Sequence, residues 1–311
     1  MTSVLIHSLS YCAGCQVAVL DLHENLLEVL PKIEILQAPI LMDEKTLPEV
    51  DVALIDGAVT NMEEVENIRE VREKSKTVIG LGSCATYGGI PGLASLFSSN
   101  SLRETVFKKS ITAIDKTEPT EVPQPTPRVY PLHSFIDVDY FIIGCPPTPE
   151  IIGEALTALI EGKPPKRYEK AVCADCKRVV KEESLDRLYR LNEKVPDPEI
   201  CLLSQGFICR GSVTRGGCKA PCPSNGVTCL GCRGPSDKIL KGRDKDPVTE
   251  LVDRISRLTH IPHDEVEKQV HEMVSVPHLF YLYLMSSPEV RLRPRSTISE
   301  YIYRLTPAER I

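Results

Sequence analysis

The sequence predicts an α/β protein: a parallel sheet comes first, then a cysteine-rich segment, then a helical tail. Three observations support this order. The first 160 residues alternate apolar, strand-like runs with helical patterns. The segment from Cys173 to Cys232 holds eight of the twelve cysteines and has little hydrophobic periodicity. From Asp246 onward the amphipathic helical pattern returns. Continuous apolar strands separated by helices are typical of a parallel sheet that is covered on both faces.

The elements of the first part are predicted from their local patterns. Apolar runs predict strands at 4–9, 33–39, 51–59, 77–85 and 140–147. Helical periodicity predicts helices at 17–30, 62–74 and 149–161. The first of these helices should stop at Pro31. The last should be capped by Thr148, with Pro149 at its first position and Gly162 after its end. Five prolines at 117–131 predict an insertion without regular structure.

The rest of the chain divides by composition. The cysteine-rich segment cannot fold by core packing alone, so a bound group must organise it. The tail should form two or three helices. We predict three segments at 1–165, 166–245 and 246–311. The apolar run at 276–285 is only about half the roughly 20 residues that a membrane span needs. We expect it to contact a partner protein, although core packing is the more common use of such a stripe.

Composition excludes several function classes. The 37 basic and 43 acidic residues give a formal charge of −6, which offers no electrostatic footprint for nucleic acid. No segment is long and apolar enough to span a membrane. The N-terminus carries no secretory signal pattern, so we expect a cytoplasmic protein. In that reducing compartment twelve cysteines indicate metal binding rather than disulfides.

Four cysteines belong to the predicted sheet. Cys12, Cys84 and Cys145 each follow the end of a predicted strand, and Cys15 completes a C-x-x-C motif with Cys12. Because the carboxyl ends of parallel strands lie on one edge of the sheet, these thiols should converge there. Buried free thiols are the alternative, since cysteine packs like a small apolar residue. Four thiolates can bind a structural zinc ion or a [4Fe–4S] cluster.

The other eight cysteines form two further sets of four. One contains Cys173, Cys176, Cys201 and Cys209, and the other contains Cys218, Cys222, Cys229 and Cys232. A pair of zinc ribbons is the competing interpretation, because paired C-x-x-C motifs are typical of them. Cys201 and Cys209 stand singly, which argues against ribbons. His7, His23 and His133 are interpreted as structural, since twelve thiols already make three full sets.

These motifs resemble the small, electron-transferring subunit of [NiFe] hydrogenases. The resemblance rests on C-x-G-C at the first strand end, on "GSCATYGG" and "GCPP", and on the 25-residue step from Cys176 to Cys201. It implies a flavodoxin-like first domain and three [4Fe–4S] clusters. The proximal cluster would be bound by Cys12, Cys15, Cys84 and Cys145, the medial cluster by Cys218, Cys222, Cys229 and Cys232, and the distal cluster by Cys173, Cys176, Cys201 and Cys209.

Details of the sequence narrow the resemblance to one subfamily. The segment "DPEICLLSQGFICRGSVTRGGCKAPCPSNGVTCLGCRGP" is similar to the gamma subunit of the methyl-viologen-reducing, F420-non-reducing hydrogenases. The resemblance implies that H2 is split at a nickel–iron centre in a separate large subunit, so this chain has no catalytic site of its own. Electrons would pass from the proximal cluster through the medial to the distal one. They would then reach an iron–sulfur or flavin subunit of the heterodisulfide reductase system.

Two positions depart from the wider family. Cys173 stands where periplasmic members have a distal histidine, and an anionic thiolate there should lower the distal potential. Gln16 stands where related chains often have a glutamate, and an amide cannot titrate. A proton passing here would need another carboxylate, such as one from the large subunit; alternatively, position 16 has no proton role. A zinc-stabilised scaffold and a flavodoxin-like redox protein are the remaining alternatives.

Overall fold

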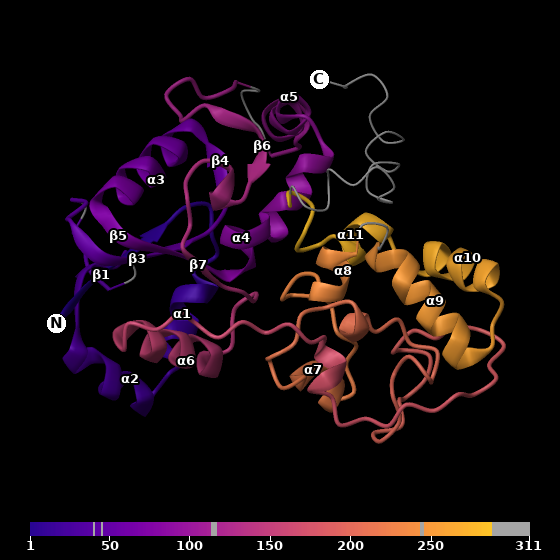
Figure 1. The fold of residues 1–311 in the computed structure, drawn as a ribbon. Coiled ribbons are helices and arrows are strands. Elements are labelled where there is room, and N and C mark those ends of the chain that lie inside the picture. The colour runs from indigo at the N-terminus through magenta and orange to yellow at the C-terminus, as the bar shows by residue number, and fades with distance from the viewer. Residues whose placement is uncertain (40, 45, 113–116, 243–245, 288–311) are drawn as a thin grey trace. The chain divides into compact units, whose positions relative to one another are not determined.

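The structure is a computed structural model that describes residues 1–287, except 40, 45, 113–116 and 243–245 (Figure 1). Its contacts divide the described residues into two compact units. The first unit contains Met1–Lys166 and residues 284–287, and the second contains Arg167–Tyr283. Each unit is described by itself. The functional assignment of the three predicted segments remains a prediction.

The first unit is built on a five-stranded parallel sheet. Its strands run in the order β2-β1-β3-β5-β7, and every neighbouring pair is parallel. This order matches the flavodoxin-like, doubly wound arrangement. The predicted fold class is therefore confirmed. The strand bounds are β1 (Thr2–Ser8), β2 (Ile33–Gln37), β3 (Val50–Asp56), β5 (Ser75–Leu81) and β7 (Tyr140–Ile142).

Helices cover both faces of this sheet, with α3 on one side and α1 and α6 on the other (Figure 1). The helical segments are α1 (Gly14–Leu20), α2 (Glu24–Val29), η1 (Leu30–Lys32), α3 (Met62–Lys74), α4 (Gly82–Tyr87), η2 (Ile90–Leu96), α5 (Ser99–Arg103), η3 (Glu104–Lys109), η4 (Leu132–Ser134) and α6 (Pro149–Ile160).

Helix α3 shows how sequence and packing agree. Asn61 and Glu64 form a capping box, in which each side chain accepts a hydrogen bond from the other's backbone N–H. Val65, Ile68 and Val71 recur on one face and are buried in the core against the sheet. Burying three such side chains contributes roughly 5–9 kcal/mol before the loss of chain entropy is counted. The helix predicted at 62–74 has these same bounds.

Three local predictions are wrong. The helix expected at 17–30 is broken between α1 and α2, where His23 adopts a positive φ of 49° that a continuous helix cannot contain. The proline-rich insertion contains strand β6 (Pro125–Tyr130), which pairs antiparallel with β4 (Val59–Asn61). A strand in a two-stranded ribbon is an edge strand, where proline is tolerated. Thr148 occupies the N-cap of α6, but its side chain makes no capping hydrogen bond.

The second unit combines an irregular cysteine-rich segment with helices. From 173 to 232 it has only isolated β-bridges and helical turns of three or four residues. The helical segments of the second unit are η5 (Val172–Ala174), η6 (Arg210–Ser212), α7 (Pro221–Ser224), α8 (Asp237–Lys241), α9 (Pro247–Thr259), α10 (His263–Met273) and α11 (Val276–Phe280). The helices expected after Asp246 are thus present, while residues 288–311 of the predicted tail lie outside the described residues.

The apolar run at 276–285 is buried rather than exposed. Phe280, Tyr281, Leu284 and Met285 each expose 1% or less of their surface. The expectation that this run contacts a partner is therefore wrong for these side chains. Within the described residues, no helix has the length and apolar character needed to cross a bilayer.

Candidate metal centres

The first four predicted ligands lie at one edge of the parallel sheet. Cys12 and Cys15 follow β1, Cys84 lies in α4 directly after β5, and Cys145 follows β7. These positions are at the carboxyl ends of three strands in one sheet. Cys84, Cys145 and Cys12 are all close enough for their charges to raise the pKa of Cys15. The structure therefore brings these four thiols together.

Glycine backbone makes room for these sulfur atoms. A Cβ added at Gly82 would lie 2.4 Å from the Cys15 Sγ, and one at Gly89 would lie 2.4 Å from the Cys84 Sγ. Gly82 has a φ of +87°, which disfavours any other residue. The Ser83 N–H donates to the Gly144 carbonyl at 2.7 Å, which ties the loop after β7 to the start of α4. The site is thus a cradle in which main chain approaches sulfur closely.

A buried carboxylate lies at the same sheet edge. Asp56 ends β3, between the strands that lead to Cys15 and Cys84, and it exposes 1% of its surface. The Ser8 Oγ donates to its Oδ1 at 2.8 Å, and the Gln16 Nε2 donates to the same oxygen at 3.2 Å. Burial raises the pKa of Asp56, which these hydrogen bonds oppose. Burial raises the pKa of Cys15 most, and the charge of Asp56 adds to that effect.

The second set of thiols lines one cavity. Cys173, Cys176, Cys201 and Cys209 border a small space of ≈ 20 Å³, together with Val172, Leu202, Leu203 and Gly211. A Cβ at Gly211 would lie 3.5 Å from the Cys173 Sγ and 3.7 Å from the Cys209 Sγ. Burial raises the pKa values of Cys173 and Cys209 to about 11. The grouping predicted from the sequence therefore corresponds to one pocket.

In the third set, which contains Cys218, Cys222, Cys229 and Cys232, interactions link only some of the four thiols. Burial raises the pKa of Cys229 to about 12, and the charge of Cys209 and, less strongly, that of Cys232 add to this effect. Burial lowers the pKa of the Arg233 guanidinium, and the charges of Cys218 and Cys232 oppose that effect, so both thiols lie near Arg233. Cys222 lies in α7 and is exposed, and no side-chain interaction within the described part of the chain joins it to the other three. The Cys229 N–H donates to the Cys209 Sγ at 3.3 Å, which connects the third set to the second.

A buried arginine supports the third set. Arg210 exposes 2% of its surface and donates to the carbonyl oxygens of Leu230, Leu279 and Phe280, the last at 2.6 Å. Burial lowers its pKa to about 10, and the charge of Cys229 opposes that effect. A cation held here offsets negative charge on the thiolates, because opposite charges attract more strongly away from water.

The donors of the first two sets are of the kind that iron–sulfur clusters use. Four cysteine sulfurs with glycine backbone beside them leave room for such a cluster. Among the described residues, no group of three or more His, Cys, Asp or Glu side chains is arranged to hold a single metal ion. All twelve cysteines are free thiols.

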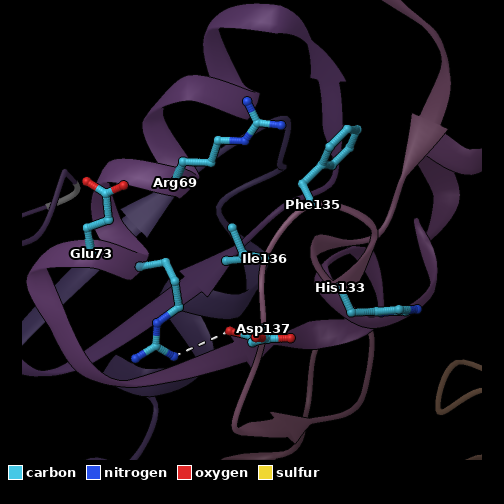
Figure 2. A pocket seen from close by; sticks show the side chains of 7 residues that line it. Arg69, Glu73, His133, Phe135, Ile136 and Asp137 are labelled. Atoms are coloured by element: carbon cyan, nitrogen blue, oxygen red, sulfur yellow. Dashed lines mark hydrogen bonds between the residues drawn. The ribbon is translucent and has the colours of Figure 1, made fainter.

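A separate surface hollow does not belong to these sites. It has a volume of ≈ 400 Å³ and lies between α3 and the segment around η4, lined by Arg69, Arg72, Glu73, His133, Phe135, Ile136 and Asp137 (Figure 2). Arg72 already donates to the Asp137 carbonyl at 3.3 Å and forms an ion pair with Asp139 at 2.7 Å. The Arg72 guanidinium therefore already has partners within the fold.

The sequence analysis missed Asp56 and Arg210. For Asp56 a signal was present, since an acidic residue that ends an otherwise apolar strand, "VALID", faces the functional edge of the sheet. For Arg210, which directly follows Cys209, no such signal exists because its three acceptors come from segments up to 70 residues away. His7 and His133 have buried ring nitrogens in the first unit, in agreement with a structural role.

Comparisons with known proteins agree with this geometry. Residues 12–159 match a family described as NADH ubiquinone oxidoreductase, 20 kDa subunit. The chain is 48% identical over 231 residues to a subunit of the vhu F420-non-reducing hydrogenase of Methanococcus voltae, and the match covers 74% of this chain and 80% of that protein. It is 35% identical over 285 residues to a subunit of the F420-non-reducing hydrogenase of Methanothermobacter thermautotrophicus, with coverages of 87% and 91%.

One solved structure extends the comparison to the fold. A chain in the crystal structure of an NAD⁺-reducing [NiFe]-hydrogenase in the H2-reduced state is 34% identical, with a TM-score of 0.51. The match covers 53% of this chain and 94% of that chain. This match thus spans about half of the present chain and nearly all of the other.

Proposed function

The chain belongs to the small-subunit family of the F420-non-reducing hydrogenases, whose members are electron-transferring subunits of [NiFe] hydrogenases, and we propose that it binds three [4Fe–4S] clusters. The observation that carries this proposal is the cavity bordered by Cys173, Cys176, Cys201 and Cys209. Its four thiols come from positions up to 36 residues apart in sequence (209 − 173 = 36), and none of them forms a disulfide. When bound, the clusters supply one-electron redox chemistry.

We assign the three sets to three clusters as the sequence predicts. The sheet-edge set (Cys12, Cys15, Cys84 and Cys145) would hold the proximal cluster, the cavity set the distal one, and Cys218, Cys222, Cys229 and Cys232 the medial one. The hydrogen bond from the Cys229 N–H to the Cys209 Sγ supports adjacent medial and distal clusters. Cys222 is exposed, so its assignment to the medial cluster is the one that the substitution experiment described next tests most directly.

Paired substitutions test this division. Single Cys→Ala changes should each remove up to about 4 of about 12 iron atoms and the same share of sulfide, because alanine offers no donor in place of the thiolate. Cys176→Ala with Cys201→Ala should remove little more iron than either alone. Cys176→Ala with Cys222→Ala should remove about twice as much. Additive losses within the first pair would contradict the division, and stoichiometric zinc in a colourless protein would replace the proposal with a zinc-stabilised scaffold.

We further propose that the chain works with a [NiFe] hydrogenase large subunit and delivers electrons to a subunit of the heterodisulfide reductase system. The relatives from Methanococcus voltae and Methanothermobacter thermautotrophicus, at 48% and 35% identity, are subunits of F420-non-reducing hydrogenases, which supports an acceptor other than F420. The anaerobically purified assembly should oxidise H2 with viologen dyes. With heterodisulfide reductase added, H2 should reduce a heterodisulfide substrate, whereas F420 alone should not be reduced. Reduction of F420 without a further enzyme would contradict this assignment.

The environment of Gln16 bears on the proton route. Its Nε2 donates to Ser8 and Asp56, so the amide is a fixed donor in a buried network. We propose that position 16 holds this network in place and that a proton passing near the proximal site uses a carboxylate, either Asp56 or one from the large subunit. We also propose a cytoplasmic location, since twelve free thiols suit a reducing compartment.

A further inference from the structure

A second cavity in the Arg167–Tyr283 unit has no role in the function proposed above. It has a volume of ≈ 530 Å³, within the range of small-molecule sites. One wall is the face of α9 that carries Glu250, Asp253, Arg254 and Arg257, at spacings of three and four residues. The other walls come from residues 169–171, 212–213, 236 and 238. We call it the α9 cavity.

The acidic side chains of the α9 cavity lie beside basic ones. Glu250 pairs with Lys238 at 2.5 Å, and Asp253 lies 3.0 Å from the His263 ring. Glu169, the remaining carboxylate, lies 4.0 Å from Lys241, which also pairs with Asp237 at 2.9 Å. None of these carboxylates pairs with an arginine of the cavity in the described part of the chain.

Three cations of the α9 cavity have no such partner. Lys170, Arg254 and Arg257 line the space, and none of them forms an ion pair within the described residues. Lys170 and Arg257 are exposed, whereas Arg254 is half-buried and its Nε is buried without a hydrogen-bond acceptor. A buried N–H without an acceptor is costly, so its position in a cavity wall indicates that something else accepts from it.

Two hydroxyl groups add to this surplus of donors. Ser236 exposes 1% of its surface, and its Oγ has no hydrogen-bond partner among the described residues. The same holds for the buried Oγ of Ser212. Both serines line the same cavity as Arg254. The α9 cavity thus combines three cations that form no ion pair and two hydroxyl groups that form no hydrogen bond in the described part of the chain.

We propose that the α9 cavity is an oxyanion site that takes the phosphate group of a small molecule. Guanidinium groups bind phosphate through paired N–H donors, and serine hydroxyls complete the hydrogen bonding of the remaining oxygens. The cavity is larger than one phosphate, so it has room for the rest of the ligand. Ordered water is the competing occupant, because it can also satisfy buried hydroxyls.

Calorimetry on the cluster-loaded full chain tests the site with inorganic phosphate, AMP and adenosine as probes. Phosphate and AMP should bind in a saturable 1:1 manner, and adenosine should not. Arg254→Gln and Arg257→Gln should each weaken binding about tenfold or more, because each removes a charge-assisted contact. Arg190→Gln, at an exposed arginine elsewhere in the unit, is the matched control and should leave affinity unchanged. Ser236→Ala should weaken binding a few-fold without loss of stability, since its hydroxyl has no partner in the protein.

The outcomes separate the possible occupants of the α9 cavity. AMP binding more tightly than phosphate identifies a nucleotide-like ligand, and equal affinities identify phosphate itself; both support the site. Absence of saturable binding, or equal weakening by Arg190→Gln, overturns the site and leaves water as the occupant.

Discussion

Replacing Gly82 with alanine should release the proximal cluster by moving one of its ligands. The added Cβ would lie 2.4 Å from the Cys15 Sγ and 3.5 Å from the Gly144 carbonyl oxygen. Since carbon and sulfur need a separation of at least about 3.5 Å, the thiol must move by about 1 Å or more. Metal–ligand distances tolerate only about 0.2 Å. The displacement is therefore several times larger than the site can absorb.

Backbone strain at Gly82 must be separated from this clash. Its φ of +87° would cost alanine roughly 1–2 kcal/mol even in open space. Gly162 is the matched control, because it has a φ of +71° and a Cβ there meets nothing within 4 Å. Gly162→Ala should thus show the strain alone, and the difference between the two variants isolates the contact with Cys15.

Iron and sulfide analysis, EPR and thermal unfolding of both variants measure the effect. Gly162→Ala should keep its full iron content and lose about 1–2 kcal/mol of stability. Gly82→Ala should lose about a third of the iron together with the proximal EPR signal, while the signals of the other clusters stay. Full iron content in Gly82→Ala, or equal loss in both variants, would refute the reasoning.

Three further variants test the framework by urea unfolding of the full chain. Arg210→Met leaves three backbone carbonyls without the donor of a buried side chain and should cost about 3–5 kcal/mol; a loss below about 1 kcal/mol would contradict this account. Asp237→Asn breaks a buried ion pair with Arg215 (3.0 Å) and should cost about 2–4 kcal/mol at pH 7. Despite burial, hydrogen bonding from Lys241 and the nearby arginines hold the pKa of Asp237 below its usual 3.8, so its contribution is present above pH 3.8 and lost as the pH falls further. A gap to wild type that stays constant below pH 3.8 would disprove this. Asn61→Ala removes the α3 cap and should cost about 1 kcal/mol, with no change in iron content.

The sheet and its thiols illustrate what local pattern predicts well. Apolar runs located each strand of the parallel sheet, because a strand buried on both faces needs apolar residues on both. A cysteine after such a run could then be placed on the sheet edge, since parallel strands end on the same side. The same reasoning failed at 17–30, where the apolar spacing continues across a backbone break at His23. It failed again at 125–130, where an edge strand tolerates prolines.

The amino-acid sequence by itself determined the fold class, and it predicts a division of the twelve thiols into three sets and the kind of group they suit. Those properties depend on residue type and spacing along the chain. Only the tertiary structure decided that Asp56 lies buried beside the sheet-edge thiols, that Arg210 is enclosed by distant carbonyls and that the cations of the α9 cavity lack partners among the described residues. Burial and charge compensation are set by contacts between segments far apart in sequence, and no local pattern encodes them.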